Sequence, residues 1–306
     1  MENGLTNITR QAPFAIEHKG DHYCGRFFAM ASPCELLIDT QDAMLASELT
    51  TIAQAEVSRI EHKFSRYRSD NLMYQLNHGE GQAVDIDDET YRLLQFANTC
   101  FEISDGMFDL TSGVLRRAWN FNGSDQLPTQ QLVNKLLPLI GWQKVAFNPT
   151  ELIMPKAMEL DFGGIGKEYA VDCVAKLCTQ HAPSVSVVIN FGGDIQVTRP
   201  RNNNQFWHIG IESLKDDNLT AQIIKIKAGG LATSGDARRY LLKDGVRYSH
   251  ILNPKTGYPV VDTPRSITVA ASHCVQAGLL ATLALLQGQG AEDFLTSQHV
   301  KHWCYR

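Results

Sequence analysis

Three glycines within four residues mark the central segment, residues 160–172, as a place where the backbone turns tightly or approaches another group closely. Gly163, Gly164 and Gly166 follow an apolar approach, and Lys167 and a helical pattern come directly after them. Backbone N–H groups, a helix N-terminus and a cation could therefore converge on one anion, such as a phosphate. The spacing matches neither the dinucleotide-binding fingerprint nor the P-loop. Glycines before a helix also serve tight turns and close packing, so both explanations stay open.

The composition is typical of a folded globular protein. Of 306 residues, 43% are hydrophobic and 20% are charged. The net charge of −5 argues against a surface that binds nucleic acid. Seven scattered cysteines form no C-x-x-C pair, which favours reduced thiols. The sequence shows neither a signal peptide nor a membrane span, so we expect a cytoplasmic protein, although a removed leader would leave no trace here.

Apolar periodicity predicts an α+β fold. Residues 1–24 are polar and unpatterned, and we expect a flexible arm there, followed by one domain over residues 25–306. Helices are predicted at residues 42–64, 89–104, 130–137, from the glycine stretch to about 177, and at 275–286. Strands are predicted at residues 26–38 with an interruption at Pro33, 141–147, 152–158, 185–191, 207–211, 223–227 and, as the last strand, 266–271. Strands in runs as well as between helices favour two interlocked lobes that meet at the glycine stretches.

A second glycine turn and a histidine carry further polar chemistry. Gly192 and Gly193 follow an apolar strand, and such a turn can approach a ligand closely. His250 opens a polar block that ends at Pro259. A histidine pKa near ~6.5 suits proton removal at neutral pH, which makes His250 a candidate general base. A lone histidine is also often structural.

Six sequence blocks follow one another between residues 26 and 288. They are Phe64-Ser-Arg-Tyr with Leu76-Asn77, Asp105-Gly-Met-Phe-Asp-Leu-Thr, Leu160-Asp-Phe-Gly-Gly-Ile-Gly-Lys with Tyr169-Ala-Val-Asp, Asn190-Phe-Gly-Gly-Asp, Thr233-Ser-Gly-Asp and His250-Ile-Leu-Asn-Pro-Lys-Thr-Gly-Tyr-Pro. In this order the set resembles the ApbE-like flavin transferases, the FAD:protein FMN transferases. The resemblance implies one ApbE-like domain, built of two interlocked α/β lobes with largely antiparallel sheets flanked by helices.

The resemblance also implies a metal-dependent transferase. The FMN moiety of FAD would pass to a Thr or Ser hydroxyl of an acceptor flavoprotein, with release of AMP. Cleaving a pyrophosphate requires a cation to neutralise developing charge, donors that hold the phosphates, and a base near the incoming hydroxyl. We therefore expect Mg²⁺ as cofactor and FAD as substrate. Two alternatives stay open: an FAD-binding relative without transferase activity, and an FAD pyrophosphatase that gives FMN and AMP.

Roles for individual residues follow from the resemblance. It implies Mg²⁺ ligation by the backbone carbonyl of Gly164 and by Thr282. It implies contacts with the flavin nucleotide for Met30, Tyr67, Met107, Phe108, Asp109, Asp161, Gly163, Lys167, Gly192, Gly193 and Ile251. Met30 and Phe108 would equally suit a hydrophobic core.

Position 278 departs from the family pattern. The family has an Asp there, one helical turn before Thr282, and both residues ligate Mg²⁺, whereas this chain has Gly278. Because Mg²⁺ is usually held by one or two carboxylates, a weakened site is expected. Glu168, where the family usually has Gly, is a candidate to compensate, although a solvated helix residue is the commoner explanation. We expect Gly278→Asp to place a carboxylate beside Thr282 without distorting the helix.

Overall fold

An antiparallel sheet of eight strands forms the centre of the protein. The computed structural model describes residues 14–121, 125–212, 220–236 and 240–306. In spatial order the strands are β1 (Ala15–His18), β2 (Tyr23–Ala29), β3 (Ser32–Ile38), β7 (Val187–Phe191), β8 (Asp194–Val197), β11 (Gly229–Gly235), β14 (Ser266–Ala271) and β15 (Lys301–Tyr305). Every neighbouring pair is antiparallel. With the helices described below, this confirms the predicted α+β fold and its largely antiparallel pairing.

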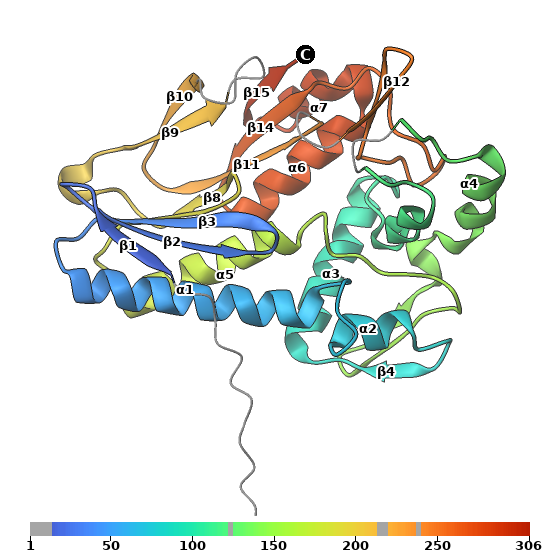
Figure 1. Cartoon of the computed structure of the whole chain (residues 1–306), viewed down its shortest axis with the longest axis horizontal. Helices are drawn as coiled ribbons and strands as arrows, with labels where there is room; N and C mark the ends of the chain where they lie inside the picture. The colour runs from blue at the N-terminus through green and yellow to red at the C-terminus, as the bar shows by residue number, and fades with distance from the viewer. Residues whose placement is uncertain (1–13, 122–124, 213–219, 237–239) are drawn as a thin grey trace, which may run out of the picture.

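Three helices cover one face of this sheet. They are α1 (Ala43–Phe64), α5 (Gly166–His181) and α6 (Cys274–Leu286), and they share one hydrophobic core with the strands (Figure 1). Side chains alternate along β7, so that Ile189 enters this core while Val188 points to the opposite face. A hairpin of β9 (Trp207–Glu212) and β10 (Thr220–Ile226) covers that opposite face.

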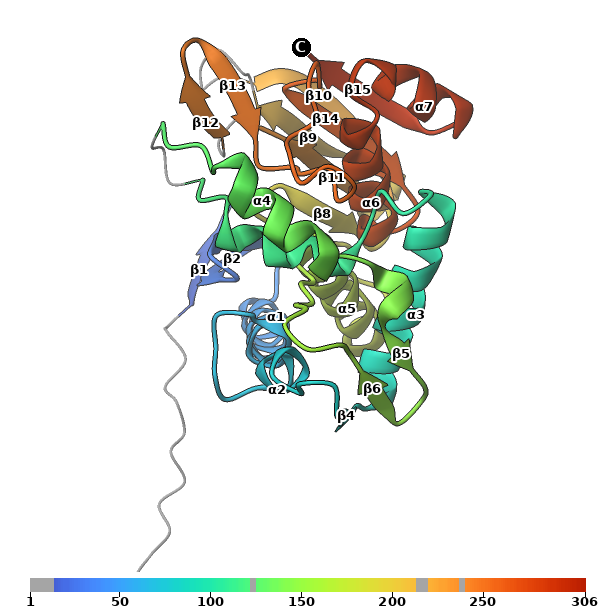
Figure 2. The same cartoon turned by 90° about the vertical axis from the view of Figure 1, so that its right-hand side faces the viewer.

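The remaining elements pack beside the helical layer and around the end of the sheet. They are α2 (Leu72–Asn77), α3 (Asp88–Ile103), α4 (Gln130–Leu136), α7 (Ala291–Ser297), the small sheet β4 (Ala83–Asp85), β6 (Glu151–Ile153) and β5 (Ala146–Phe147), and the hairpin β12 (Tyr240–Lys243) and β13 (Val246–Ser249). A cluster around the buried Trp119 joins α4 to the β12–β13 hairpin, and Figure 2 views the molecule from this side.

Four of the predicted helices, including α1 and α3, lie within a residue or two of their expected bounds, and α5 runs four residues further than expected. Other predictions are wrong. The strand predicted at residues 141–147 shrinks to β5, because Trp142–Lys144 form a 3-10 helix, and the strand predicted at residues 152–158 ends at Ile153. The arm predicted for residues 1–24 extends too far, because β1 and the start of β2 pair with each other from Ala15 onward; residues 1–13 lie outside the described residues. The single strand predicted at residues 26–38 is instead the hairpin β2–β3, which turns at Met30 and Ala31.

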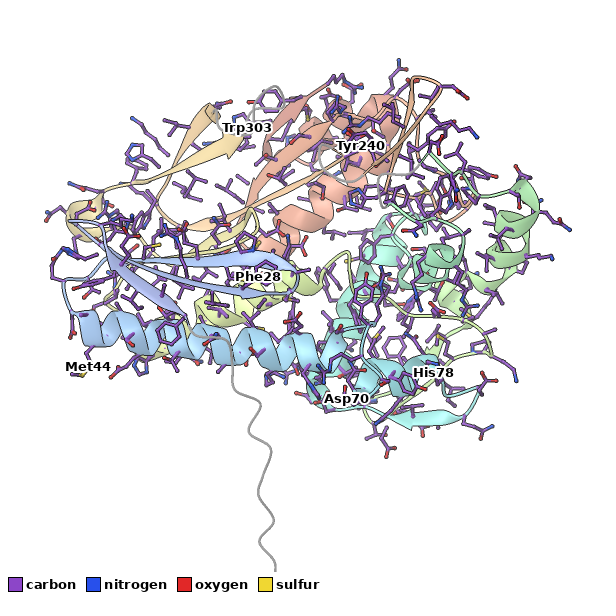
Figure 3. All side chains as sticks on the ribbon, in the orientation of Figure 1. Phe28, Met44, Asp70, His78, Tyr240 and Trp303 are labelled. Atoms are coloured by element: carbon purple, nitrogen blue, oxygen red, sulfur yellow. The ribbon has the colours of Figure 1, made fainter. Side chains whose placement is uncertain are left out.

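The C-terminus also differs from the prediction, because β14 is not the last strand. β15 pairs with β14 and forms the edge of the sheet. Its Trp303 packs against the hydrophobic cluster that the β9–β10 hairpin covers (Figure 3). Within the described residues, no helix has the length and apolar character needed to cross a membrane.

Candidate active site

A cleft of about 1200 Å³ opens where the glycine turns, the β2–β3 hairpin and α6 meet. It collects residues that the sequence predicted from widely separated blocks: Met30, Tyr67, Asp161, Gly163, Gly164, Lys167, Gly192, Gly193, His250, Ile251 and Thr282. The fold therefore brings most of the predicted site into a single cavity.

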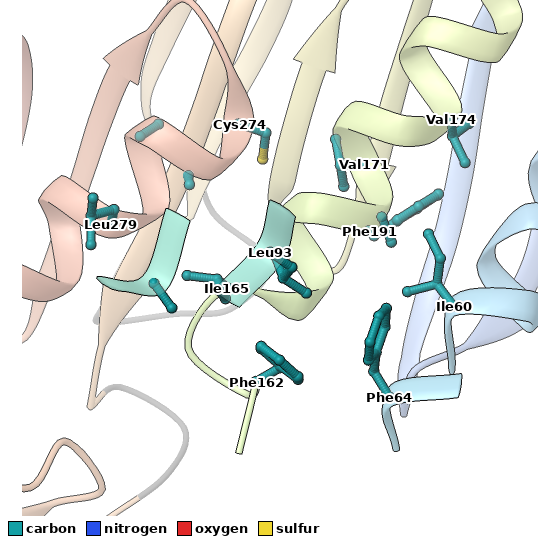
Figure 4. Close-up of a cluster of buried hydrophobic side chains, with 14 of the residues drawn as sticks. Ile60, Phe64, Leu93, Phe162, Ile165, Val171, Val174, Phe191, Cys274 and Leu279 are labelled. Carbon is teal, nitrogen blue, oxygen red and sulfur yellow. The ribbon is translucent and has the colours of Figure 1, made fainter. Parts of the chain in front are cut away.

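The first glycine turn is anchored in the hydrophobic core on both sides. Phe162 and Ile165 are buried, and the ring of Phe162 packs edge-on against Phe64 of α1, with 5.2 Å between centroids (Figure 4). Within the turn, the amide of Gly163 donates a 2.9 Å hydrogen bond to Oδ1 of Asp161. A side chain at Gly163 would begin 3.1 Å from that same oxygen, so glycine allows the carboxylate to fold back onto the turn.

The second glycine turn joins β7 to β8. Gly192 and Gly193 have φ angles of +62° and +100°, a region that favours glycine. The amide of Gly192 donates to the carbonyl of Pro33 at 3.0 Å, and that of Gly193 donates to Oδ1 of Asn190 at 2.9 Å. With the amide of Gly163, three of the N–H groups expected to hold a phosphate already have acceptors in the chain. These three amides therefore stabilise their own turns in this structure, and phosphate binding by the glycine stretches stays a prediction.

Lys167 supplies the positive charge between the two turns. Its Nζ lies 2.7 Å from Oδ2 of the buried Asp194, and a side chain at Gly192 would come within 3.5 Å of it. Burial lowers the pKa of Lys167, but the attraction of Asp194 and its hydrogen bond outweigh that effect and raise the pKa above its usual value. Lys167 is therefore a cation at neutral pH. Asp194 was not among the predicted site residues, although it closes the Asn190-Phe-Gly-Gly-Asp block.

Asp161 pairs with a cation that the sequence analysis did not single out. Its carboxylate binds the guanidinium of Arg66 within the cleft. Arg66 also donates to the hydroxyl of Tyr67 at 2.9 Å and lies 5.0 Å from the centre of its ring. Tyr67 is 81% exposed, so its ring offers an accessible aromatic surface at the cleft. The signal for Arg66 was its place in the Phe64-Ser-Arg-Tyr block.

Met107, Phe108 and Asp109 do not line the cleft. Asp109 is buried, and its carboxylate accepts hydrogen bonds from the amide and hydroxyl of Thr111 and from the amide of Trp142. Phe108 is buried beneath Gly164, and Met107 packs against the hydrophobic core. In this arrangement Phe108 supports the first glycine turn, and none of the three residues lines the cavity.

His250 lines the opposite part of the cleft, next to β13. Its half-buried ring makes an edge contact with Phe121, with 6.3 Å between centroids. The neighbouring Ser249 is buried, and its hydroxyl accepts a hydrogen bond from the amide of Ile251 at 3.1 Å. This bond fixes the backbone that carries the histidine.

Glu168 occupies the space above Gly278. An added side chain at Gly278 would begin 2.6 Å from Oε1 of Glu168 and 2.8 Å from its Cγ. Glu168 is only 9% exposed, so it is not a solvated helix residue, and Gly278→Asp could not be accommodated unless Glu168 moved. Burial, reinforced by the nearby Asp194, raises the pKa of Glu168 to about 8. Two expectations are therefore corrected: Glu168 is not solvated, and the space beside Gly278 is not free for an Asp side chain. Compensation by Glu168 stays a prediction.

Thr282 of α6 brings a hydroxyl group to the cleft. The Thr282 hydroxyl lies 2.9 Å from the hydroxyl of Ser234 on β11, and both residues line the cleft. Over the part of the chain that the structure describes, no three His, Cys, Asp or Glu side chains cluster as metal ligands. A cation held here would therefore need hydroxyl or backbone carbonyl oxygens in addition to a carboxylate.

Comparison with known proteins assigns this chain to a family. The model of the ApbE family matches residues 30–303. The FAD:protein FMN transferase of Vibrio cholerae is 29% identical over 77% of this chain and 73% of its own, and that of Klebsiella pneumoniae is 28% identical over 86% and 81%. The crystal structure of the ApbE protein from Thermotoga maritima superposes with a TM-score of 0.84 at 27% identity, covering 92% of this chain and 94% of that one. The family match spans most of the sequence and the same fold recurs in a solved member, so this chain belongs to the ApbE family.

Proposed function

We propose that this protein transfers the FMN moiety of FAD to a Thr or Ser hydroxyl of an acceptor flavoprotein and releases AMP. The observation that carries the proposal is the single cleft, which brings Lys167, His250 and Thr282 together from three distant parts of the chain. Its volume of about 1200 Å³ suits a dinucleotide better than a small metabolite. The relatives named FAD:protein FMN transferase match this chain over most of its length.

Each part of the reaction has a candidate group in the cleft. His250 would accept the proton of the incoming hydroxyl, because it combines a suitable ring with access to the cavity. Lys167 would hold a phosphate as a point charge once the ligand competes with Asp194. The exposed ring of Tyr67, with Arg66 beside it, would support the flavin ring.

Mg²⁺ is part of this proposal. The residues present fit such an ion, because Oε2 of Glu168 is buried without a hydrogen-bond partner and hard oxygen ligands suit Mg²⁺. The Thr282 hydroxyl and the Gly164 carbonyl would hold the ion together with a carboxylate. When bound, the ion would neutralise charge that develops on the pyrophosphate.

Incubation of the full chain with FAD, Mg²⁺ and a flavin-acceptor domain tests the proposal. We expect covalent flavin fluorescence on the acceptor in a denaturing gel and an equal amount of AMP in solution. An acceptor whose target Thr is replaced by Val is the matched control and should stay unlabelled. Free FMN with AMP would instead indicate a pyrophosphatase, and bound FAD without AMP would indicate a binding protein; either result contradicts the proposal.

The cytoplasmic location also stays a prediction. It rests on seven cysteines that all carry free thiols in the structure. Fractionation of the source cells, followed by detection of the protein in each fraction, would test it.

A further inference from the structure

Two successive helical turns of α5 contact two successive helical turns of α6. Asp172 of α5 accepts hydrogen bonds from the amides of Cys274 and Val275, at 2.9 and 3.0 Å, and so caps the start of α6. One turn earlier on α5, Glu168 lies against Gly278, one turn later on α6. Because residues four apart share a helix face, the two helices run antiparallel here. The next turn of α6 brings in Thr282, toward the end of α5 where the glycine turn begins.

Gly278 makes room for the Glu168 side chain. Glycine inside a helix is unfavourable relative to alanine, so it needs a reason at this position. The reason is the close approach of Glu168, since any side chain at Gly278 would overlap its carboxyl group. Two neighbours of Gly278 on α6, Ala277 and Ala281, are small as well and fully buried. The helix is therefore shaped to admit this carboxyl group.

One oxygen of the Glu168 carboxyl group is buried without a hydrogen-bond partner among the described residues. This atom, Oε2, is fully enclosed and makes no hydrogen bond in the described part of the chain. A buried carboxyl oxygen without a partner is costly and rare in folded proteins. Glu168 and Thr282 both line the cleft, where the Thr282 hydroxyl is paired with that of Ser234. A cation that is coordinated by oxygen atoms would give Oε2 a partner and remove the free-energy cost of its burial.

We propose that Glu168 is the carboxylate ligand of a divalent-cation site, formed with Thr282, and that Gly278 exists to admit it. Relative to the family pattern stated above, the carboxylate has moved from α6 to the facing turn of α5. The site is therefore relocated rather than lost. This inference rests on the proposed function, in which a Mg²⁺ ion assists the transfer.

Cation binding to the full chain tests the inference without reference to activity. Calorimetric titration with Mg²⁺, and electron paramagnetic resonance with Mn²⁺, would be made in the absence of FAD. Glu168→Gln keeps the shape of the side chain and removes its ability to bind a cation as a carboxylate, and we expect it to weaken binding of both ions at least tenfold. The matched control is Asp172→Asn, a carboxylate one turn further on the same face of α5, which should change cation affinity less than threefold.

An exchange of the two positions gives a second, independent measurement. Gly278→Asp alone should weaken cation binding, because its side chain and Glu168 cannot occupy one space. The double variant Glu168→Gly/Gly278→Asp returns the carboxylate to α6, and we expect affinity within threefold of the native chain. Circular dichroism identifies any variant that fails to fold, in which case Glu168→Gln decides.

The outcomes separate this inference from the proposed function. Unchanged Mg²⁺ and Mn²⁺ affinity in Glu168→Gln, or no binding of either ion by the native chain, would overturn the relocated site even if FMN transfer occurs. Cation binding that depends on Glu168, in a chain that transfers no FMN to the acceptor, would contradict the proposed function and leave the cation site standing.

Discussion

His250 provides the most direct test of the proposed chemistry. We expect His250→Ala to lower the transfer rate by ~10²–10⁴, which is the usual contribution of a general base, and to change FAD affinity only a few fold. Single-turnover labelling of the acceptor and equilibrium titration with FAD measure the two effects. His181→Ala is a suitable control, because this exposed histidine pairs with Glu48 at the far end of α5. A transfer rate that stays unchanged in His250→Ala would remove the residue from the mechanism.

Single residues of the site were predictable where a short motif fixes them. The glycines and Lys167 belong to short sequence blocks, and all of them line the cleft, as these blocks predicted. The use of the Gly192 amide was not predictable, because its acceptor, the carbonyl of Pro33, comes from another strand. The burial of Glu168 was equally hidden, since it depends on how α5 and α6 pack and not on the sequence around this residue.

The cap that α5 provides for α6 makes a prediction about stability. Asp172 satisfies two amides at the start of α6, and no side chain of α6 itself caps that end. Asp172→Ala should therefore lower the free energy of unfolding by about 1–2 kcal/mol, as the loss of an N-cap typically does. Urea denaturation measures the change. Asp172→Asn retains an oxygen acceptor and should lose less; equal losses in both variants would show that the cap is not the cause.

Glu89 links three helices and makes a prediction about pH. It accepts hydrogen bonds from Arg59 and Lys63 of α1 and from the Tyr169 hydroxyl of α5. Burial raises the pKa of Glu89, but these three donors outweigh burial and lower it from 4.5 to about 2. Because the pKa is lower in the folded state, the stabilisation is complete above pH ~4.5 and is lost as the pH falls toward ~2.

The measurement is the free energy of unfolding from pH 6 to pH 2 for the native chain and Glu89→Gln. At about 1.4 kcal/mol per pKa unit, and with allowance for the partly exposed partners, the variant should lack on the order of 2 kcal/mol of this acid-sensitive stability. Glu102→Gln, an exposed position on the same helix, should follow the native curve. Parallel curves for Glu89→Gln and the native chain would contradict the prediction.

Elements with a clear apolar period were predictable, and those defined by pairing were not. α1 has Asp42 as its N-cap and a continuous buried stripe, so the sequence located it within one residue. The β2–β3 hairpin was missed because Met30 and Ala31 adopt positive φ angles, of 50° and 55°, at which Asn and Gly are the usual residues. β15 was missed because its sequence has no strand partner nearby in the chain.

β15 pairs along one edge of the sheet, and a truncated chain tests how much this strand stabilises the protein. A chain that ends at His299 lacks β15, which leaves β14 as an unpaired edge and removes Trp303 from the hydrophobic cluster. We expect a loss of about 3 kcal/mol or more in the free energy of unfolding, comparable to the removal of a buried Trp side chain. Removal of Arg306 alone is the control, because it breaks only exposed contacts and its pair with Glu292. Equal stability of the two truncated chains would contradict this account.

From one edge of the sheet to the other, the strands follow the order of the chain. During synthesis, each new strand of the sheet is therefore made after the strand beside which it will pair. A chain interrupted before α6 would already hold both glycine turns and Lys167, and with them the features that the sequence makes most obvious. It would lack Thr282 and the small residues that receive Glu168. The cation site that we propose can therefore form only after α6 has been made and has packed against α5.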